Sequence, residues 1–285
     1  MRPANDERMT RLPILRIVAA DSLRLHESHD PGRTHPLVTT LRRDGYLKNP
    51  PVIAPLDNGH IHYVVLDGAN RVSAFALLEY PHVLAQVVDY ESEDVTLGAW
   101  NHLVVSLSTQ ALLTRLQGLP SVRLVELPLA EARARLSQHE VLCYLVLPDG
   151  GVMAALGETN NLEIWARTLR EVVEVYMPHG KIFRTQQDKL TGLDDFSSTG
   201  SALVVFPHFR PNQVMELARG QGRLPAGITR HLISPRALRV NYPLEELSAA
   251  FSLEEKNLRL KEWLHQKTVN QSVRFYAEAT VLYDE

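Results

Sequence analysis

The stretch VVLDGANRVSAFALL, residues 64–78, joins two kinds of structure with almost no room between them. Its first residues form a short apolar run that predicts a buried strand, and the residues after Asp67 and Gly68 predict a helix. A strand that enters a glycine turn and opens directly into a helix points several free backbone N–H groups in one direction. Because the helix dipole adds partial positive charge at the same place, the turn is a candidate anion site.

The residues of this turn suit a nucleotide phosphate. Gly68 permits the turn, and the backbone of Ala69 and Asn70 supplies N–H groups at the helix start. Arg71 can offer a two-pronged guanidinium to phosphate oxygens. Asp67, at the strand end, can hold a divalent cation directly or orient one of its waters. The alternative is that Asp67 caps the helix and Arg71 is a surface residue.

Composition and motifs exclude several classes of protein. The sequence has neither a G-x-x-x-x-G-K-[ST] loop nor a G-x-G-x-x-G loop after a strand, so the common phosphate loops are absent. A formal net charge of −3 argues against duplex DNA as the main ligand. The single cysteine, Cys143, excludes a disulfide framework or a cysteine-rich zinc site. Its apolar neighbours favour a residue in the core of a strand rather than a reactive thiol.

The sequence also indicates where the protein works. No apolar run approaches the roughly 20 residues of a membrane helix. The beginning, MRPANDERMTRLPIL, has no apolar segment suited to a secretion signal. We therefore expect a cytoplasmic protein that makes no membrane contact.

Short alternating elements predict a small α/β module in residues 1–92. Gly45 stops the first predicted helix, and the stretch DNGH, residues 57–60, predicts a hairpin turn between two apolar runs. The predicted strands are 12–18, 50–56, 60–66 and 82–90, and the predicted helices are 34–45 and 70–78.

The acidic segment DYESEDVTLG, residues 89–98, predicts a boundary, and residues 93–285 then predict a second α/β domain. Its first part, residues 99–119, carries apolar residues at helical spacing up to Gly118 and Pro120. Further predicted helices are 129–139, 160–176, 211–220 and 244–266, and the predicted strands are 121–127, 141–147, 202–206, 236–240 and 273–283. The fold class is α/β or α+β in two parts.

Three stretches in sequence order carry a specific resemblance: LRLHESHDPGR, then LRRDGYLKNPPVIAPL, then YVVLDGANRVSAFALL. They resemble the ParB/sulfiredoxin superfamily, in which a turn with a glutamate, a G-x-L-x-N-P-P turn and a D-G-x-x-R helix start surround a nucleotide. Within that superfamily the sequence looks most like the free serine kinases, which use ADP or ATP. The resemblance covers residues 12–90 well, and it adds Asn49 to the expected phosphate-binding residues.

Other branches of the superfamily fit less well. Sulfiredoxins carry a catalytic cysteine in the loop where this chain has Ala69 and Asn70. Partition-type ParB proteins continue with a helix-turn-helix region, whereas the segment after Tyr90 is acidic and then apolar. Serine kinases typically have histidine in place of Asn70, although asparagine can also donate a hydrogen bond to phosphate.

Glu27 matches the essential glutamate of the resembled family, so the resemblance implies that it is the general base that accepts the serine hydroxyl proton. Taken alone, Glu27 also fits a solvated loop carboxylate. Asp30 can cap the following helix, and Arg33 either faces solvent or orients the donor phosphates.

A substrate amino acid needs a receptor for its carboxylate. Thr229 and His231 are two residues apart, so they share one side of an extended segment, while Arg230 points away. Serine kinases have a similar T-x-H pair, and Trp100 resembles their pocket-wall tryptophan. The alternatives are a structural histidine at 231 and a tryptophan that packs at a helix start.

The resemblance implies a free L-serine kinase that makes O-phospho-L-serine, with its active-site cleft between the two regions and Mg²⁺ carried with ATP or ADP at Asp67. The product would enter cysteine synthesis or a siderophore pathway. The alternative is a nucleotide-responsive ParB-like regulator that binds DNA or a protein partner without turnover, and a nuclease would need a basic groove that the sequence does not show. The paired histidines 26 and 29, or 60 and 62, lack a third ligand for zinc. The sequence leaves the donor, the pathway and the oligomeric state open.

Overall fold

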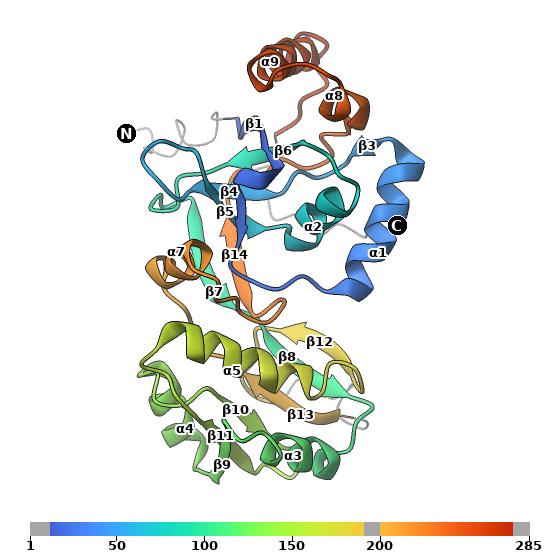
Figure 1. Cartoon of the computed structure of the whole chain (residues 1–285). Helices are drawn as coiled ribbons and strands as arrows, with labels where there is room; N and C mark the ends of the chain where they lie inside the picture. Colours follow the sequence, from blue (N-terminus) through green and yellow to red (C-terminus); the bar gives the residue numbers. More distant parts are fainter. Residues whose placement is uncertain (1–11, 191–199, 276–285) are drawn as a thin grey trace, which may run out of the picture.

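A five-stranded sheet, called here the first sheet, dominates the early part of the chain in the computed structural model, which describes residues 12–190 and 200–275 (Figure 1). Its strands, in spatial order, are β1 (Ile14–Ala19), β6 (His82–Val87), β4 (Val52–Pro55), β5 (Tyr63–Asp67) and β2 (Leu23–Leu25). β4 and β5 are antiparallel, as the hairpin signal predicted, and β2 runs parallel to β5. A 3-10 turn, η2 (Ala20–Ser22), joins β1 to β2.

The first sheet is buried on both faces. Along β5, Tyr63 and Val65 join a core with helices α1 (Pro31–Asp44) and α2 (Ala69–Leu77). The alternate residues of β5 join the core of the second half of the chain instead. Because both faces are covered, the strand reads as a continuous apolar run rather than an alternating one.

A six-stranded antiparallel sheet, called here the second sheet, follows in sequence. Its strands, in spatial order, are β12 (Lys181–Thr185), β8 (Asn101–Val105), β13 (Gly200–Val205), β10 (Cys143–Val146), β11 (Val152–Leu156) and β9 (Arg123–Glu126). Helices α3 (Thr109–Gln117) and α5 (Leu162–Glu174) pack on one face, and α4 (Leu129–Ser137) packs on the other.

A two-stranded ribbon lies between the two sheets (Figure 1). It pairs β7 (Val95–Ala99) with β14 (Thr229–Ile233) in antiparallel register. Helix α7 (Pro211–Arg219) contributes Val214 and Leu217 to the core that the two sheets share. The ribbon therefore brings residues 229–233 next to the first sheet.

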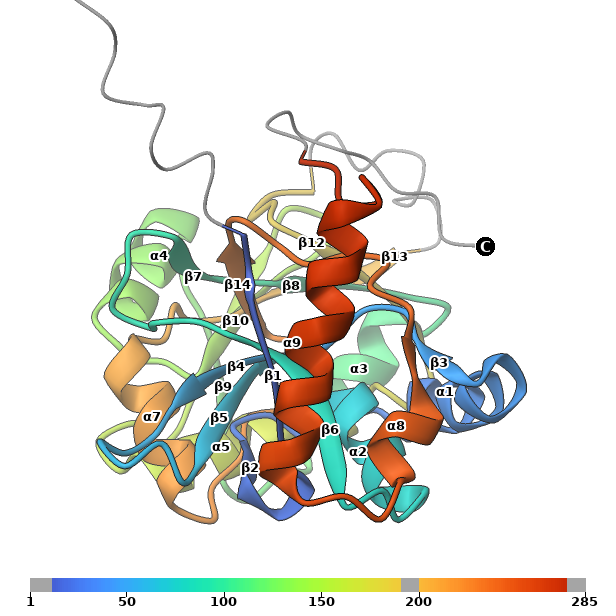
Figure 2. The same ribbon diagram turned by 90° about the horizontal axis from the view of Figure 1, so that it is seen from above.

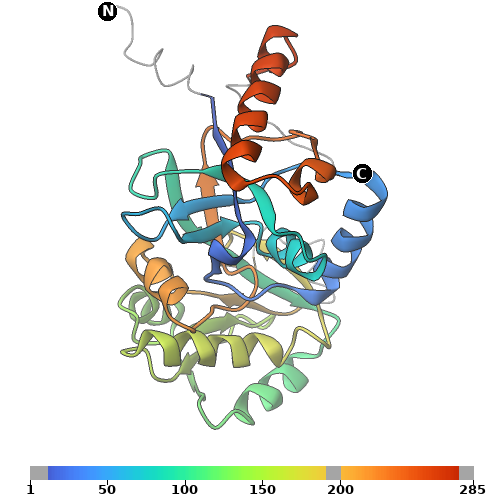
Figure 3. The ribbon, with the colours of Figure 1, turned by 45° about the horizontal axis from the view of Figure 1, so that its top comes forward.

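The end of the described chain returns to the first sheet. Strand β15 (Tyr242–Pro243) pairs with β3 (Tyr46–Leu47), and helices α8 (Leu244–Ser248) and α9 (Leu253–Val269) follow it. The two helices lie at the far end of the molecule from the second sheet (Figure 3). Helix α9 lies across β1 and β6 (Figure 2), where the Asn257 side chain bonds both the N–H and the carbonyl of Ile17, at 3.0 and 2.9 Å.

Most predicted elements are present, and three predictions are wrong. Residues 101–105 form strand β8 rather than the start of a helix, because this strand is buried on both faces and carries no alternation. The segment 236–240 is not a strand, since Arg239 and Asn241 have positive φ and the backbone turns there. The predicted helix 244–266 is two helices, with Ser252 capping α9. The predicted strand 273–283 lies mostly outside the described residues.

The packing of α9 makes a testable prediction. Leu260 is 2% exposed in the core of the first sheet, whereas Leu258 on the same helix is 60% exposed. We expect Leu260→Ala to lower the free energy of unfolding by about 2–5 kcal/mol because it opens a cavity. Leu258→Ala should change it by less than about 0.5 kcal/mol. Urea unfolding of both variants measures the difference, and equal effects would contradict the packing of α9 on this core.

Candidate active site

The Asp67–Gly68 turn has the geometry that its sequence predicts. Gly68 has φ +98°, and a Cβ added there would lie 2.9 Å from the Cβ of Pro51, so glycine is required on both counts. Helix α2 begins at Ala69, and no side chain caps its N-terminus. The first N–H groups of α2, at Ala69, Asn70 and Arg71, therefore have no partner within the helix and are open to an anion.

Asp67 lies between two arginines. Arg71 Nη2 donates to Asp67 Oδ2 at 2.8 Å, and Arg236 Nη2 donates to the same oxygen. Burial raises the pKa of Asp67, but the charges of Arg71 and Arg236 outweigh it and lower the pKa to about 2. Sequence reasoning missed Arg236, which lies 169 residues from Asp67 in the chain and belongs to no short motif.

Arg71 is more fully occupied than the phosphate hypothesis assumed. Its Nη1 donates to the carbonyl oxygens of Asn49 and Pro50, at 2.7 and 3.0 Å. The side-chain oxygen of Asn49 accepts from the N–H of Arg239 at 2.8 Å. Arg71 and Asn49 thus hold the N-P-P turn against the strand end.

Asn70 connects the starts of two helices. Its Oδ1 accepts from the N–H of Asp30 at 2.8 Å, and Asp30 caps α1 through a bond from the Gly32 N–H at 2.9 Å. The Asn70 amide nitrogen is the remaining polar group of that side chain and can still donate. Asp30 therefore has the capping role that the sequence predicted.

Glu27 lies where β2 meets residues 224–229, called here the 224–229 segment. Its Oε2 accepts from the N–H of Gly227 at 3.0 Å, and its Oε1 accepts from the N–H of Thr229 at 2.7 Å. The Thr229 hydroxyl is also within hydrogen-bond distance of Oε1. A parallel bridge between Glu27 and Leu224 continues the contact along the backbone. The predicted base and a predicted substrate residue are thus in direct contact.

His26 extends this network. Its Nδ1 lies 2.8 Å from the carbonyl oxygen of Val65, and its Nε2 lies 2.9 Å from the Thr229 hydroxyl oxygen. A carbonyl only accepts, so Nδ1 carries the proton and Nε2 of the neutral ring is an acceptor. Burial lowers the pKa of His26 and favours that neutral ring, although the charge of Glu27 opposes it. The single Thr229 hydroxyl proton therefore has two acceptors, His26 and Glu27.

His231 and Trp100 flank this network. His231 lies on the same strand face as Thr229, and its Nε2 is 2.8 Å from the Tyr90 hydroxyl. Burial, with a smaller effect of His26, lowers the pKa of His231 to about 3, so the ring is neutral near pH 7. Among the described residues its buried Nδ1 makes no well-formed hydrogen bond, although the backbone of Leu66 is close enough to raise the pKa.

The sequence predicted Trp100 at the start of a helix. In the structure it lies between strands β7 and β8. Its N–H donates to the carbonyl of Ile228 at 2.8 Å, and the guanidinium of Arg230 lies 4.8 Å from its ring centre. Trp100 therefore touches the 224–229 segment beside Thr229.

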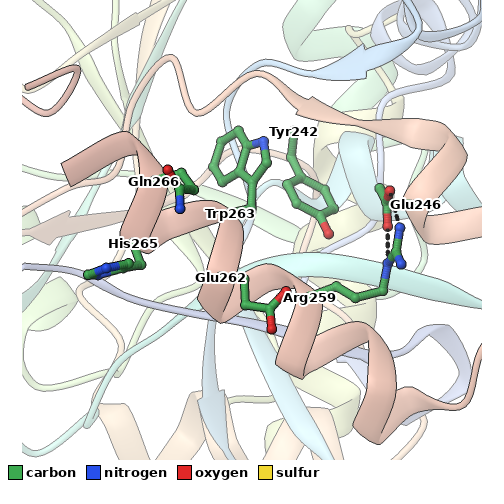
Figure 4. Close-up of a pocket in the computed structure, with 7 residues that line it drawn as sticks. All are labelled: Tyr242, Glu246, Arg259, Glu262, Trp263, His265 and Gln266. Atoms are coloured by element: carbon green, nitrogen blue, oxygen red, sulfur yellow. Dashed lines mark hydrogen bonds and ion pairs between the residues drawn. The ribbon is translucent and has the colours of Figure 1, made fainter. Parts of the chain in front are cut away.

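Two other features lie away from this network. A hollow of about 400 Å³ between α8 and α9 borders none of the predicted site residues (Figure 4). Its rim includes the ion pair of Arg259 and Glu246, with N–O distances of 2.8 and 2.9 Å. In the part of the chain that the structure describes, no three His, Cys, Asp or Glu side chains are arranged around a metal site. In the same part, no helix has the length and apolar character to cross a membrane.

The Asp67 cluster predicts a pH dependence of stability. Its carboxyl has a folded pKa of about 2, below the ordinary value of 3.8, so the ionised form contributes stability above about pH 4 that is lost as the pH falls toward 2. The side chain is 40% exposed, so solvent screening reduces the contribution to the order of 1 kcal/mol. Asp67→Asn should destabilise the fold by about that amount at pH 7.

Urea unfolding between pH 7 and pH 2.5 tests this prediction. The difference between wild type and Asp67→Asn should shrink below pH 4, because the wild-type carboxyl then becomes protonated. Asp21→Asn, at an exposed aspartate, is the matched control and should show no such difference. A deficit of Asp67→Asn that stays constant down to pH 2.5 would count against the two-arginine contact.

No family model matches the chain. The ATP-dependent L-serine kinase of Staphylothermus marinus is 33% identical over 89 residues, 31% of this chain and 35% of that protein. The chain thus matches about a third of the length of that relative. The ATP-dependent L-serine kinase SbnI of Staphylococcus aureus is 23% identical over 271 residues, 95% of this chain and 97% of SbnI.

Solved structures share the fold. C-terminally truncated SbnI from Staphylococcus aureus has a TM-score of 0.70 at 20% identity, covering 89% of this chain and 97% of that chain. A free serine kinase in complex with AMP has a TM-score of 0.70 at 18% identity, covering 86% of this chain and 98% of that chain. The chain is therefore similar in sequence to SbnI along nearly its whole length, and it shares its fold with truncated SbnI and with the free serine kinase structure.

Proposed function

We propose that this protein is a free L-serine kinase, which transfers a phosphoryl group from ATP or ADP to the serine hydroxyl and releases O-phospho-L-serine. One observation carries the proposal: Glu27 and Thr229, which lie 202 residues apart, are joined by hydrogen bonds from both the backbone and the side chain of Thr229. The predicted base and the predicted amino-acid receptor therefore form one site. The likeness to proteins described as L-serine kinases supports the same activity.

Glu27 would act as the general base. The serine oxygen attacks the terminal phosphorus of the donor, the bond from that phosphorus to the leaving oxygen of the nucleotide breaks, and the serine proton passes to Glu27. Each carboxylate oxygen offers about two acceptor positions. Oε1 faces both the N–H and the hydroxyl of Thr229, whereas Oε2 accepts from the Gly227 N–H. The remaining position, on Oε2, is free to accept the serine proton.

The Asp67–Gly68 turn would hold the donor phosphates. The uncapped N-terminus of α2 offers N–H groups, and the Asn70 amide can add another donor. Mg²⁺ fits this turn only as a companion of the nucleotide: Asp67 has one oxygen taken by two arginines, which leaves Oδ1 as its single ligand atom. A magnesium ion held by one carboxylate oxygen, phosphate oxygens and waters follows its usual coordination. Bound there, it would neutralise phosphate charge.

Thr229, His231 and Trp100 would bind the amino acid. Thr229 and His231 share a strand face, and the Nδ1 of His231, which makes no well-formed hydrogen bond within the described residues, can take part in binding a carboxylate. In this proposal residues 1–92 supply the nucleotide site, residues 93–285 supply the amino-acid site, and the reaction takes place in a cleft where the two meet. The pathway that uses O-phospho-L-serine is left open.

One observation favours a second candidate, a nucleotide-responsive regulator without turnover. Arg71 already has acceptors in the protein, and the Asn70 side chain, which replaces the usual histidine, uses its oxygen to hold α1. A turn that is satisfied in this way can bind a nucleotide without positioning it for transfer. The same assay separates the two candidates.

The test is phosphorus NMR with L-serine, Mg²⁺ and either ATP or ADP. We expect the wild type to form a phosphomonoester, with ADP or AMP as the second product according to the donor. Glu27→Gln should reduce the rate by about 10²- to 10⁴-fold, because the amide cannot accept the proton. Glu126→Gln, on an exposed position of the second sheet, is the matched control and should match the wild type.

Thermal melting shows whether Glu27→Gln keeps the fold, since the amide also alters the contact with the 224–229 segment. Nucleotide binding without phosphoserine from either donor would exclude the kinase and favour the regulator. Full turnover by a folded Glu27→Gln would leave the kinase in place but remove Glu27 as its base.

A further inference from the structure

Arg184 reaches from the second sheet to the backbone that holds Glu27. It lies on β12, and a Cβ built on Gly227 would be 1.9 Å from its Nη2, so its guanidinium occupies the space that a side chain at Gly227 would fill. The N–H of Gly227 donates to Glu27 Oε2 at 3.0 Å. The guanidinium is therefore one peptide group away from the proposed base.

The charges around Arg184 come from the proposed phosphate and base residues. Burial lowers the pKa of its guanidinium and the charge of Arg33 lowers it further, whereas the carboxylates of Glu27, Asp30 and Asp67 act in the opposite direction. These four residues belong to the end of β2, the start of α1 and the end of β5. The charge of one guanidinium from the second sheet is thus affected by charged residues from three separate parts of the first sheet and its helices.

Arg184 differs from Arg71 and Arg236 in having no hydrogen-bond or ion-pair partner among the described residues. Arg71 has three acceptors and Arg236 is paired with Asp67. The Arg184 guanidinium makes no hydrogen bond or ion pair with any residue in the described ranges 12–190 and 200–275. Arg33, which is exposed, likewise has no carboxylate partner among these residues. Two guanidinium groups in mutual reach repel each other, and an anion between them would relieve that repulsion.

We propose that Arg184 binds the phosphoryl group in transfer, which is the terminal phosphate of the donor before the reaction and the phosphate of O-phospho-L-serine after it. The inference rests on the proposed kinase function. The geometric basis of the inference is that Arg184 lies on the Glu27 side of the proposed site. The N-terminus of α2 serves the phosphates that stay with the nucleotide, whereas Arg184 stands beside Glu27, which must reach the attacking serine hydroxyl.

The chemical role of Arg184 is to neutralise charge. The reaction spreads negative charge over the three oxygens of the group in transfer, and a planar guanidinium can bond two of them. Because Arg184 has no partner among the described residues, binding this group would break none of the hydrogen bonds or ion pairs described above. We therefore expect Arg184 to contribute more to the binding of O-phospho-L-serine than to the binding of L-serine.

The experiment compares Arg184→Gln, Arg184→Lys and a control, Lys181→Gln, which removes one exposed positive charge from the same strand. Turnover is measured by phosphorus NMR, and the affinities for L-serine, O-phospho-L-serine and AMP are measured by calorimetry. Arg184→Gln should lower kcat by about 100-fold or more. It should also lower the affinity for O-phospho-L-serine about tenfold. The affinities for L-serine and AMP should stay unchanged. Arg184→Lys should recover only part of the lost kcat and of the lost affinity for O-phospho-L-serine, because an ammonium group cannot make the bidentate contact of a guanidinium.

The outcomes separate this proposal from the kinase proposal. If the wild type and Lys181→Gln make no phosphoserine, the proposed function fails and this inference fails with it. If they turn over and Arg184→Gln turns over equally well, only the role of Arg184 is overturned. If Arg184→Gln lowers the affinity for AMP as much as the affinity for O-phospho-L-serine, the residue binds a phosphate that stays with the nucleotide. That result also overturns the inference.

Discussion

The contact between Glu27 and the 224–229 segment is the interaction on which the rest of the site depends. Three donors from Gly227 and Thr229 meet one carboxylate, and the backbone pairing of His26 and Ser28 with Leu224 runs beside it. Charge-assisted hydrogen bonds of this kind are among the stronger ones in proteins. The same contact joins the two halves of the chain and orients the proposed base.

The polar network is arranged around shared atoms. Asp67 Oδ2 accepts from two arginines, and the Thr229 hydroxyl faces both His26 and Glu27. Sharing makes each of these groups sensitive to its neighbours, because a change in one proton or one charge alters which contact is made. A phosphate or a carboxylate that entered the proposed site would compete for these same donors, and its binding would redistribute the hydrogen bonds described above.

Local signals in the sequence predicted the turn well and the wider site only in part. The strand, the glycine at φ +98° and the uncapped helix start all follow from residues 64–78. Glu27 and Thr229 came from a family resemblance, and the structure brings them together. Arg236 and Arg184 were missed because their roles depend on packing between distant segments, for which a single sequence carries no local pattern. The same limit explains β8, where burial on both faces removed the alternation that marks a strand.

Helix α9 has a consequence for solubility that its packing alone does not suggest. Strand β1 is the edge of the first sheet, and an open edge presents backbone groups to which a strand of another molecule can add. The Asn257 side chain occupies both the N–H and the carbonyl of Ile17 and so imitates a neighbouring strand at the middle of this edge. A chain that ended before α9 would expose that edge beside the apolar side chains of β1, and aggregation through β1 would compete with folding.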